Sequence, residues 1–500
     1  MNDQLDRPVK RFPASLVWVG ATALLCLFFV FASVPLVNAQ SVNNSGIKQG
    51  TQRYTSMLQQ VFEFIQSHYV DEVNQEALFQ GAMKGMFDAL GDPYSVYMGP
   101  VEMAELNENV IEGTYGGVGL YISKKAGTQP NGQPYYVEVA SPIEDTPGWR
   151  AGIKPGDLII EVDGQSTDAL SLDEVVSRLK GAPGAQVQLR IRRGQSMEFP
   201  VNIVREVIEV PTVKHEMIGD IGYLRLISFS AMTLDRTREA LESFRSKGYK
   251  SLIIDLRNNY GGLLNSAVGI CDLFLEGGVV VSVKSRVASE NYEYTARRTT
   301  QVPAAIPIVV LINGSSASAS EIVAGALKDR GRAYLVGARS YGKGSVQQIY
   351  PLINDGFKIT TARYYTPSDV NIDKIGIPPD REVLFPQFTL EDEGILEKLI
   401  NDNRIPAFVG QHPRASAGEI ESFAQELRAA YPLDLSLLRR LIREELGRTE
   451  MAPIYDLDYD VQLQEGVNIL QDGSYPNLLQ TTKTLKQLQE EAAAEEDAAA

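Results

Sequence analysis

The sequence predicts a multidomain α/β protein with N-terminal helices, a strand-rich insert, an α/β core with a mostly parallel sheet, and a C-terminal helical region. Its 500 residues exceed the ~100–200 residues of an ordinary domain, so about three folded units are expected. Apolar strands followed by helices recur over residues 197–386, a pattern typical of parallel sheets covered by helices. Helical periodicity dominates before residue 113 and after residue 388.

The composition is that of an ordinary globular protein, and it disfavours several classes of function. Hydrophobic residues make up 44% and charged residues 22% of the chain, which argues against disorder and against a multi-span membrane protein. A formal net charge of −16 argues against nucleic-acid binding, which needs a basic surface. Two cysteines rule out a disulfide scaffold, and three histidines leave little for a metal site, so we expect no metal or cofactor.

The first 39 residues predict export from the cytoplasm. A basic stretch precedes an apolar run from Ala14 to Ala32. Two outcomes stay open: cleavage of a signal peptide after Val37-Asn38-Ala39, or retention as a membrane anchor through residues 14–37. Either way we expect an extracytoplasmic protein, in the bacterial periplasm or on the outer face of the cytoplasmic membrane.

The next two segments differ in their periodicity. Residues 40–112 hold a polar spacer at 40–52 and then two helical patterns, which Gly91-Asp92-Pro93 ends. Residues 113–196 switch to short strands with turn signals, including a strand at Leu158–Val162 and a following amphipathic helix. We therefore expect a helical segment followed by a separate strand-rich domain.

The second half of the chain holds the predicted α/β core and its helical extension. Residues 197–388 contain continuous apolar strands at Leu252–Leu256 and Ile308–Ile312, each followed by a loop and a helix. Residues 389–488 are again helical in pattern. The acidic, alanine-rich tail at 489–500 is expected to fray.

A serine-rich turn at residues 313–321 is the first candidate for catalytic chemistry. A strand leads into the turn and a helix starts within it, so a serine there lies beside the free N–H groups of a helix N-terminus. Such groups can stabilise the oxyanion that forms when a peptide carbonyl is attacked. The alternative is that Ser318 or Ser320 only caps the helix, with Glu321 as a first-turn acid.

A serine nucleophile needs a base, and the three histidines are poorly placed to supply one. Lysine is the other common base for serine, once burial lowers its pKa from about 10.4. Lys343 lies between Gly342 and Gly344, and these glycines allow a close backbone approach to a neighbouring turn. Gln347 follows four residues later, ~13 Å away if the chain is extended, so the glycines must turn the chain to bring the two together.

A phosphate-binding loop is the rival interpretation of this segment. Gly337-Ala-Arg-Ser-Tyr-Gly342-Lys343 fits a P-loop until Gly344 replaces the required Ser or Thr. The segment then continues into a strand-like stretch around Val346, where a P-loop needs a helix. A nucleotide-binding function is therefore disfavoured.

Several motifs together resemble the C-terminal processing (tail-specific) serine proteases. The resemblance covers residues 54–386 and implies that Ser318 is the nucleophile, Lys343 the general base and Gln347 the residue that orients the lysine. It rests on Ser-Ala-Ser-Ala-Ser-Glu-Ile at 316–322, the spacing of Lys343 and Gln347 behind it, Thr-Thr-Ala-Arg-Tyr-Tyr-Thr-Pro at 360–367, Asp-Leu-Arg-Asn-Asn-Tyr-Gly-Gly-Leu at 255–263 and Gly-Ile-Pro-Pro-Asp at 376–380.

The same resemblance implies an oxyanion hole made by backbone N–H groups, those of Ala319 and of Gly261 or Gly262. It also matches Asp329 to a supporting acid of some members, although a surface or salt-bridge role suits this helix residue better. Two positions depart from the family pattern. Tyr260 replaces a usual proline and Tyr94 a common histidine.

The strand-rich insert resembles a PDZ domain, through the glycine-rich segment at 116–120 and Arg-Ala-Gly-Ile-Lys-Pro-Gly-Asp at 150–157. Glycines expose backbone N–H groups that can hold a chain-terminal carboxylate, and the following strand edge can pair with the ligand. A purely structural β-domain is the alternative. The predicted tail-binding residues are Gly117, Val118, Gly119, Leu120, Leu172 and Val176.

The leading hypothesis is an exported endopeptidase that captures C-terminal tails of proteins or peptides and cleaves them through an acyl-enzyme. A non-catalytic scaffold is the competing hypothesis. The apolar helical segments at both ends predict a homo-oligomer, and an adaptor protein is left open as a further partner.

Overall fold

The computed structural model describes residues 45–499, apart from Ala126, residues 128–133, Gln195, residues 387–388, Leu390 and residues 450–452. The expected signal peptide or anchor at residues 1–39 lies outside the described residues. Within the described ranges, no helix combines the length and the apolar character needed to cross a membrane.

The chain divides into two compact units, with the boundary between Met83 and Lys84. The first unit contains helix α2 (Ser45–His68) and most of helix α3 (Gln75–Asp88). The expected spacer at 40–52 is wrong for its second half, because α2 already begins at Ser45. A helix that has been nucleated elsewhere extends at little cost through polar residues. Five large apolar side chains of α2 are more than half exposed: Tyr54, Met57, Leu58, Val61 and Phe64.

A six-stranded sheet forms the centre of the second unit, in the order β10-β11-β12-β15-β16-β19. The β10/β11 pair is antiparallel, and the other four pairs are parallel. Parallel strands place their carboxyl ends at one edge of the sheet, which is where the candidate residues lie. The strands are β10 (Val213–Ile218), β11 (Ile221–Leu226), β12 (Ser251–Asp255), β15 (Ile308–Ile312), β16 (Tyr334–Gly337) and β19 (Arg381–Glu382).

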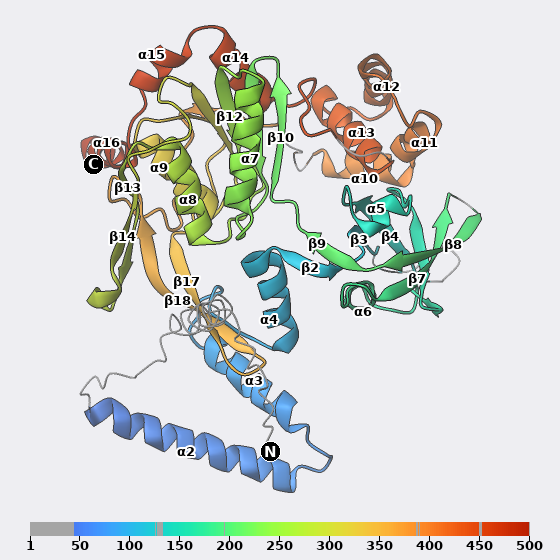
Figure 1. The fold of residues 1–500 in the computed structure, drawn as a ribbon, viewed down its shortest axis with the longest axis vertical. Helices are drawn as coiled ribbons and strands as arrows, with labels where there is room; N and C mark the ends of the chain where they lie inside the picture. Colours follow the sequence, from blue (N-terminus) through green and yellow to red (C-terminus); the bar gives the residue numbers. More distant parts are fainter. Residues whose placement is uncertain are drawn as a thin grey trace, which may run out of the picture. The chain divides into compact units, whose positions relative to one another are not determined.

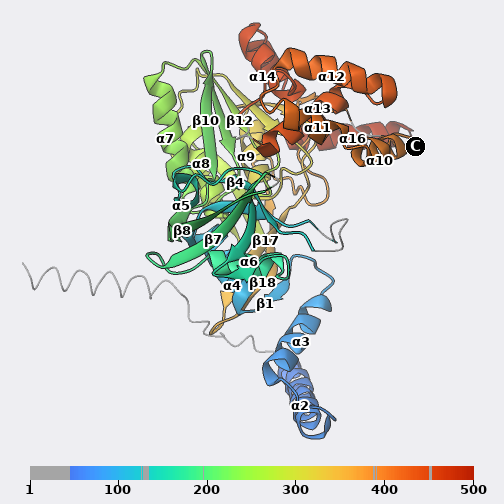
Figure 2. The same ribbon diagram turned by 90° about the vertical axis from the view of Figure 1, so that its right-hand side faces the viewer.

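Helices cover both faces of this sheet, as Figures 1 and 2 show. Alternate strand residues face opposite sides, so Leu252 and Ile254 pack with α7 (Thr233–Ser246), α8 (Leu264–Phe274) and α9 (Ala319–Asp329). Ile253, between them, packs with α14 (Val461–Gln471) on the other face. The sheet is therefore buried on both sides, as its continuous apolar strands predict.

The C-terminal segment does not form one helical region. Helices α10 (Glu393–Asn401), α11 (Arg404–Gln411), α12 (Ala417–Ala430) and α13 (Leu435–Thr449) enclose a hydrophobic cluster of their own. By contrast, α14, α15 (Tyr475–Gln480) and α16 (Leu485–Ala499) add residues to the clusters of the central sheet. The expected fraying of residues 489–500 is also wrong as far as Ala499, because these alanines and glutamates, which are good helix formers, continue α16.

A second, antiparallel sheet carries the lysine segment. Its order is β1-β18-β13-β14, and β17 also pairs with β18. The hairpin of β17 and β18 follows the loop that contains Lys343. The strands are β1 (Val96–Met98), β13 (Gly278–Ser285), β14 (Tyr292–Ala296), β17 (Ser345–Pro351) and β18 (Gly356–Tyr365), with a short helix η2 (Ala288–Glu290) between β13 and β14.

The strand-rich insert has its own sheet and its own hydrophobic cluster. Strand β8 pairs with β7, so the predicted boundary after residue 196 falls inside this hairpin, and residues 197–204 belong to the insert sheet. Strands β2 (Thr114–Gly117) and β9 (Glu206–Glu209) pair at its entrance and exit. The sheet contains β3 (Leu120–Ser123), β4 (Val137–Pro142), β5 (Leu158–Val162), β6 (Gln165–Ser166), β7 (Gln186–Arg193) and β8 (Met197–Val204), with helices α5 (Pro147–Arg150) and α6 (Leu172–Leu179).

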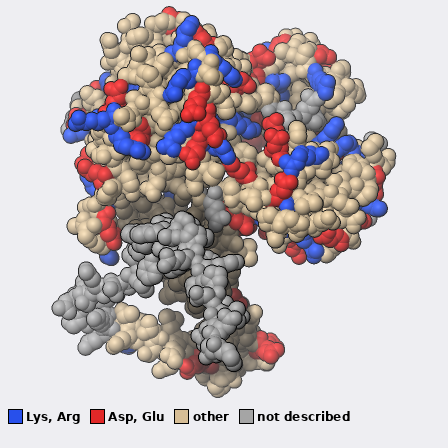
Figure 3. Space-filling view, viewed as in Figure 1, with Lys and Arg blue, Asp and Glu red and all other residues tan. Residues whose placement is uncertain are grey.

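Two short helices, α4 (Pro100–Leu106) and η1 (Asn107–Glu112), precede the insert. On the face of the molecule seen in Figure 3, basic and acidic side chains are interspersed.

Candidate active site

Ser318 lies at the point where the loop after β15 turns into helix α9. Its backbone is strained, with φ 56° and ψ −114°, a conformation that residues other than glycine rarely adopt. Its backbone N–H donates to the Glu321 carboxylate over 2.9 Å. The turn therefore presents the serine in a fixed, strained conformation at a helix N-terminus.

Hydrogen bonds join this turn to the loop after β12. The carbonyl oxygen of Asn259 accepts from the Ala317 N–H at 3.0 Å and from the Ser320 hydroxyl at 2.8 Å. Ser320 is thus a structural residue, because its hydroxyl is used inside the protein. Gly261 lies so close that a Cβ there would stand 2.8 Å from the Cβ of Ser318. Only glycine fits at this approach.

The predicted oxyanion donors are not equivalent. Ala319 is the first residue of α9, so its N–H has no acceptor within the helix. The Gly261 N–H donates to the Asn259 side chain over 2.9 Å and is therefore occupied. For the Gly262 N–H the described residues supply no hydrogen-bond acceptor. Ala319 and Gly262 are consequently the pair whose N–H groups are available to an oxyanion.

Lys343 lies in the loop between β16 and β17, and its ammonium group does not hydrogen-bond Ser318 within the described structure. Nζ instead lies over the ring of Tyr94, 4.6 Å from the ring centre. Burial lowers the pKa of Lys343, and the positive charge of Lys358 lowers it further, while Asp92 and Glu321 oppose the shift. The lysine thus has the depressed pKa of a base, while its ammonium group rests on an aromatic ring.

Gln347 also has other partners than Lys343. Its side-chain amide donates to the hydroxyls of Ser345 at 2.8 Å and Thr360 at 3.1 Å. Residues Ser345–Pro351 form strand β17, which excludes the phosphate-binding loop because that loop needs a helix here.

Glu321 is the residue that sequence reasoning underrated. Its fully buried carboxylate accepts the backbone N–H groups of Ser318, Gly342 and Lys343 at 2.9, 2.7 and 2.9 Å, and the Ser340 hydroxyl at 2.6 Å. Burial raises the pKa of Glu321, and these four donors work against that shift. One acid therefore holds the backbones of the serine turn and the lysine loop together.

Tyr364 is a second residue that touches both segments. Its buried hydroxyl donates to the carbonyl oxygen of Lys343, and the Ser318 hydroxyl is near enough to lower the pKa of the phenol. Burial raises the pKa of Tyr364 well above its ordinary value, so the phenol stays protonated. Tyr364 therefore borders both the lysine loop and the serine turn.

The remaining candidates lie outside this cluster. Asp329 accepts from the Ser368 hydroxyl and backbone and from the Leu485 N–H, so it ties α9 to a loop and to α16. The three histidines have other partners: His68 stacks on Phe64, His215 packs on Phe244 and His412 stacks on Phe408.

The predicted tail groove is a narrow cavity of about 50 Å³ between β3 and α6. Val118, Leu120 and Val176 line it, whereas Leu172 packs into the insert core and Gly119 lies against Thr146. The ring of Tyr115 lies against Gly117, and Lys180 at the groove pairs with Glu108 of η1 at 2.7 Å. The remaining lining residues are Tyr115, Ile122, Leu179 and Lys180.

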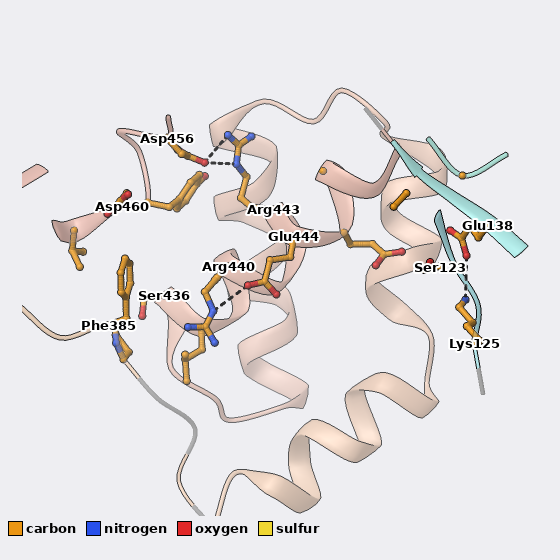
Figure 4. A pocket seen from close by; sticks show the side chains of 18 of the residues that line it. Ser123, Lys125, Glu138, Phe385, Ser436, Arg440, Arg443, Glu444, Asp456 and Asp460 are labelled. Atoms are coloured by element: carbon orange, nitrogen blue, oxygen red, sulfur yellow. Dashed lines mark hydrogen bonds and ion pairs between the residues drawn. The ribbon is translucent and has the colours of Figure 1, made fainter. Parts of the chain in front are cut away.

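A much larger cavity, of about 840 Å³, is lined by residues of the insert sheet and of α13. Its walls carry ion pairs, including Arg443 with Asp456 at 2.7 Å and Arg440 with Glu444 at 3.5 Å, which Figure 4 shows. Among the described residues of its lining, none is a predicted site residue. The catalytic candidates and this cavity are therefore separate features.

Comparison with protein families matches three parts of the chain. Residues 220–383 match the model of peptidase family S41, and residues 138–193 match a PDZ domain. Residues 20–100 match the N-terminal domain of the activating protease CtpB. The matched peptidase segment contains the Ser318 turn, the Lys343 loop and the loop at 256–262.

Similar curated proteins extend over most of the chain. The carboxy-terminal-processing protease of Bartonella bacilliformis is 38% identical over 71% of this chain and 81% of its own length. A probable CtpA-like serine protease of Staphylococcus epidermidis is 32% identical over 76% of this chain and 75% of its own length. The carboxy-terminal processing protease CtpA of Bacillus subtilis is 32% identical over 77% of this chain and 79% of its own length. The chain therefore belongs to peptidase family S41, among the carboxy-terminal-processing serine proteases with a PDZ domain.

Proposed function

We propose that this protease cleaves peptide bonds with a Ser318/Lys343 dyad in which Gln347 orients the lysine. The observation that carries the proposal is the Glu321 carboxylate, because one of its oxygens accepts the backbone N–H groups of both Ser318 and Lys343 at 2.9 Å. The two residues are thereby tied at their backbones, and the ammonium group of Lys343 rests on the ring of Tyr94.

The reaction follows from these groups. Neutral Lys343 takes the proton of the Ser318 hydroxyl while Oγ attacks the peptide carbonyl carbon, and the N–H groups of Ala319 and Gly262 stabilise the oxyanion. Collapse breaks the C–N bond, and the proton passes from Lys343 to the leaving amine. Water, deprotonated by the same lysine, then hydrolyses the acyl ester and restores the serine.

The test is cleavage of an unfolded or tail-exposed protein by purified variants. Ser318→Ala and Lys343→Ala should each lower kcat by roughly 10³-fold or more while the circular dichroism spectrum stays unchanged. Full activity of purified Lys343→Ala would refute the dyad. Covalent labelling of the wild type, but not of Ser318→Ala, by a fluorophosphonate would exclude the non-catalytic scaffold.

The groove at β3 and α6 is the proposed capture site for the C-terminal tail of a protein or peptide substrate. Because Gly117 and Glu206 are paired neighbours on β2 and β9, residues 118–205 can be replaced by an Asn-Gly turn without separating the flanking strands. Loss of the preference for tail-bearing over tail-less substrates is expected in this deletion. An unchanged preference would remove the groove from the proposal.

Export and self-association complete the proposal. The apolar stretch at 14–37 would carry the chain to the extracytoplasmic side, where it is either cleaved or anchored. The exposed apolar side chains of α2 suit burial against a second copy, and an adaptor protein is an alternative cover. Light scattering of the purified protein distinguishes a second copy from an adaptor. If a second copy covers α2, Val61→Lys should lower the oligomeric mass, whereas the control Gln59→Lys should not.

A further inference from the structure

A buried ion-pair cluster connects α14 with the loop that carries the candidate oxyanion donor. Arg257 lies two residues after Asp255, the last residue of β12, and donates to the Asp255 carboxylate at 2.9 and 2.6 Å. Tyr223 donates to the same carboxylate over 2.6 Å. Asp255 is almost fully buried, and the cluster is therefore shielded from solvent.

Asp460 completes this cluster from a distant part of the chain. The Arg257 guanidinium donates to both oxygens of the Asp460 carboxylate, at 2.7 and 2.6 Å, and also to Gln462 at 3.1 Å. Such two-point contact fixes the plane as well as the position of a guanidinium. Burial disfavours the charged guanidinium, but the two carboxylates hold the pKa of Arg257 well above its ordinary value.

The backbone after Arg257 leads directly to the oxyanion loop. Asn259 is fully buried, and its side chain donates to Leu226 and accepts the Gly261 N–H. Gly261 in turn lies against Ser318. A shift of Arg257 would therefore move the loop on which Gly262 presents its N–H, because only one residue separates Arg257 from Asn259.

We propose that Asp460 is a positioning residue for catalysis: through Arg257 it fixes the loop at 258–262 in register with Ser318. This inference rests on the proposed oxyanion role of Gly262. Asp460 itself touches no reacting atom. It lies at the start of α14 and lines the 840 Å³ cavity, where Figure 4 labels it.

Asp460→Asn is a sharp test because asparagine caps helices as well as aspartate does, so the bond to the Leu463 N–H can persist. The substitution removes the charge and one of the two acceptors for Arg257. Asp456→Asn is the matched control. Asp456 lies four residues earlier and pairs with Arg443 instead of Arg257.

Three measurements are made on the full chain: kcat and KM for an unfolded substrate, affinity for a peptidyl boronate, and the melting temperature. A boronate forms a tetrahedral adduct on the serine and so reports the oxyanion hole. Asp460→Asn should lower kcat and boronate affinity in parallel, each by about tenfold, with KM little changed, since losing one oxyanion donor outright costs ~10²–10³-fold. Arg257→Lys, which cannot span two carboxylates, should do the same more strongly.

Unchanged kcat and boronate affinity in a folded Asp460→Asn protein would overturn the inference. Equal losses in Asp456→Asn would also overturn it, because they would reveal a general effect of this segment on stability. If Asp460→Asn does not fold, Arg257→Lys alone decides by the same two readouts. Failure of the wild type to cleave or bind the boronate through Ser318 would instead refute the proposed function.

Discussion

The two halves of the candidate site differ in how firmly the protein holds them. The serine half lies at the carboxyl ends of buried parallel strands, and Ser316, Ser320, Glu321 and Asn259 are all inaccessible to solvent. The lysine half lies beside the antiparallel sheet of β17 and β18. Its neighbour Tyr341 is 58% exposed, and the Lys343 ammonium rests on an aromatic ring.

This difference indicates which half has more freedom to move. The serine turn is already strained, and the backbone N–H groups of Ala317, Ser318 and Ser320 are all bonded, so it has little freedom. The lysine side chain is tied only at its backbone, through Glu321 and Tyr364. We expect the protein to control activity through the lysine half while the nucleophile stays in place.

The largest effect should come from breaking the link between the halves. In the wild type, the two oxygens of the Glu321 carboxylate accept four hydrogen bonds. Glu321→Gln replaces one oxygen by an NH₂ group, which cannot accept from the N–H groups that face it. We expect kcat to fall by about 10–100-fold, since an unsatisfied buried donor costs ~1–3 kcal/mol. Glu419→Gln is the control, because Glu419 caps α12 by the same geometry and its other contact, with His412 at 3.5 Å, lies outside the candidate site. Similar losses in both variants would show that Glu321 is only a helix cap.

A smaller effect, of opposite sign, should come from releasing the lysine. Tyr94→Leu removes the ring under Nζ, and a contact of this kind is worth ~0.5–2 kcal/mol. We therefore expect basal cleavage of a tail-less peptide to rise several-fold. Tyr365→Leu removes an equivalent ring from under Lys284, 4.2 Å away, and should leave the rate unchanged. A fall in basal rate for Tyr94→Leu would show that the ring supports the active arrangement.

The smallest effect should be a displacement of the pH profile. Lys358 lowers the pKa of Lys343 and Asp92 raises it, so removing either charge shifts that pKa in the opposite direction. In the proposed dyad only neutral Lys343 can act as a base, so the acidic limb of kcat/KM should report its pKa. The limb should move to higher pH in Lys358→Met and to lower pH in Asp92→Asn. Shifts of the same sign in both variants would contradict a lysine base.

Sequence reasoning predicted the parts of the molecule that depend on local pattern. The strand at Leu158–Val162 and the strand at Ile308–Ile312 have the predicted bounds, because turn residues and continuous apolar runs mark them. The approach of Gly261 to the serine turn is implied only by the family resemblance, not by the local pattern. The sequence does not predict that α14 packs on the central sheet while α10 to α13 form a cluster of their own. The amphipathic pattern of a helix shows that one face is buried but not which surface covers it.

The polar geometry of the site was less predictable. Nothing at Glu321 distinguishes an acid with one capping bond from one that also accepts the N–H groups of Gly342 and Lys343. The partner of Lys343 depends on Tyr94, which lies 249 residues earlier in the chain. Such contacts form when two sheets pack together, so the spacing of residues along a single sequence does not predict them.

The positive φ of Ser318 implies a trade between durability and chemistry. A backbone held at φ 56° costs of order 1–3 kcal/mol, which glycine would largely recover because it has no Cβ. A Ser318→Gly protein should therefore resist heat better than the wild type, whereas Ser318→Ala retains the strain. Selection for stability alone would favour glycine at this position, so a serine retained here in related chains would indicate that the proposed reaction outweighs the cost in stability.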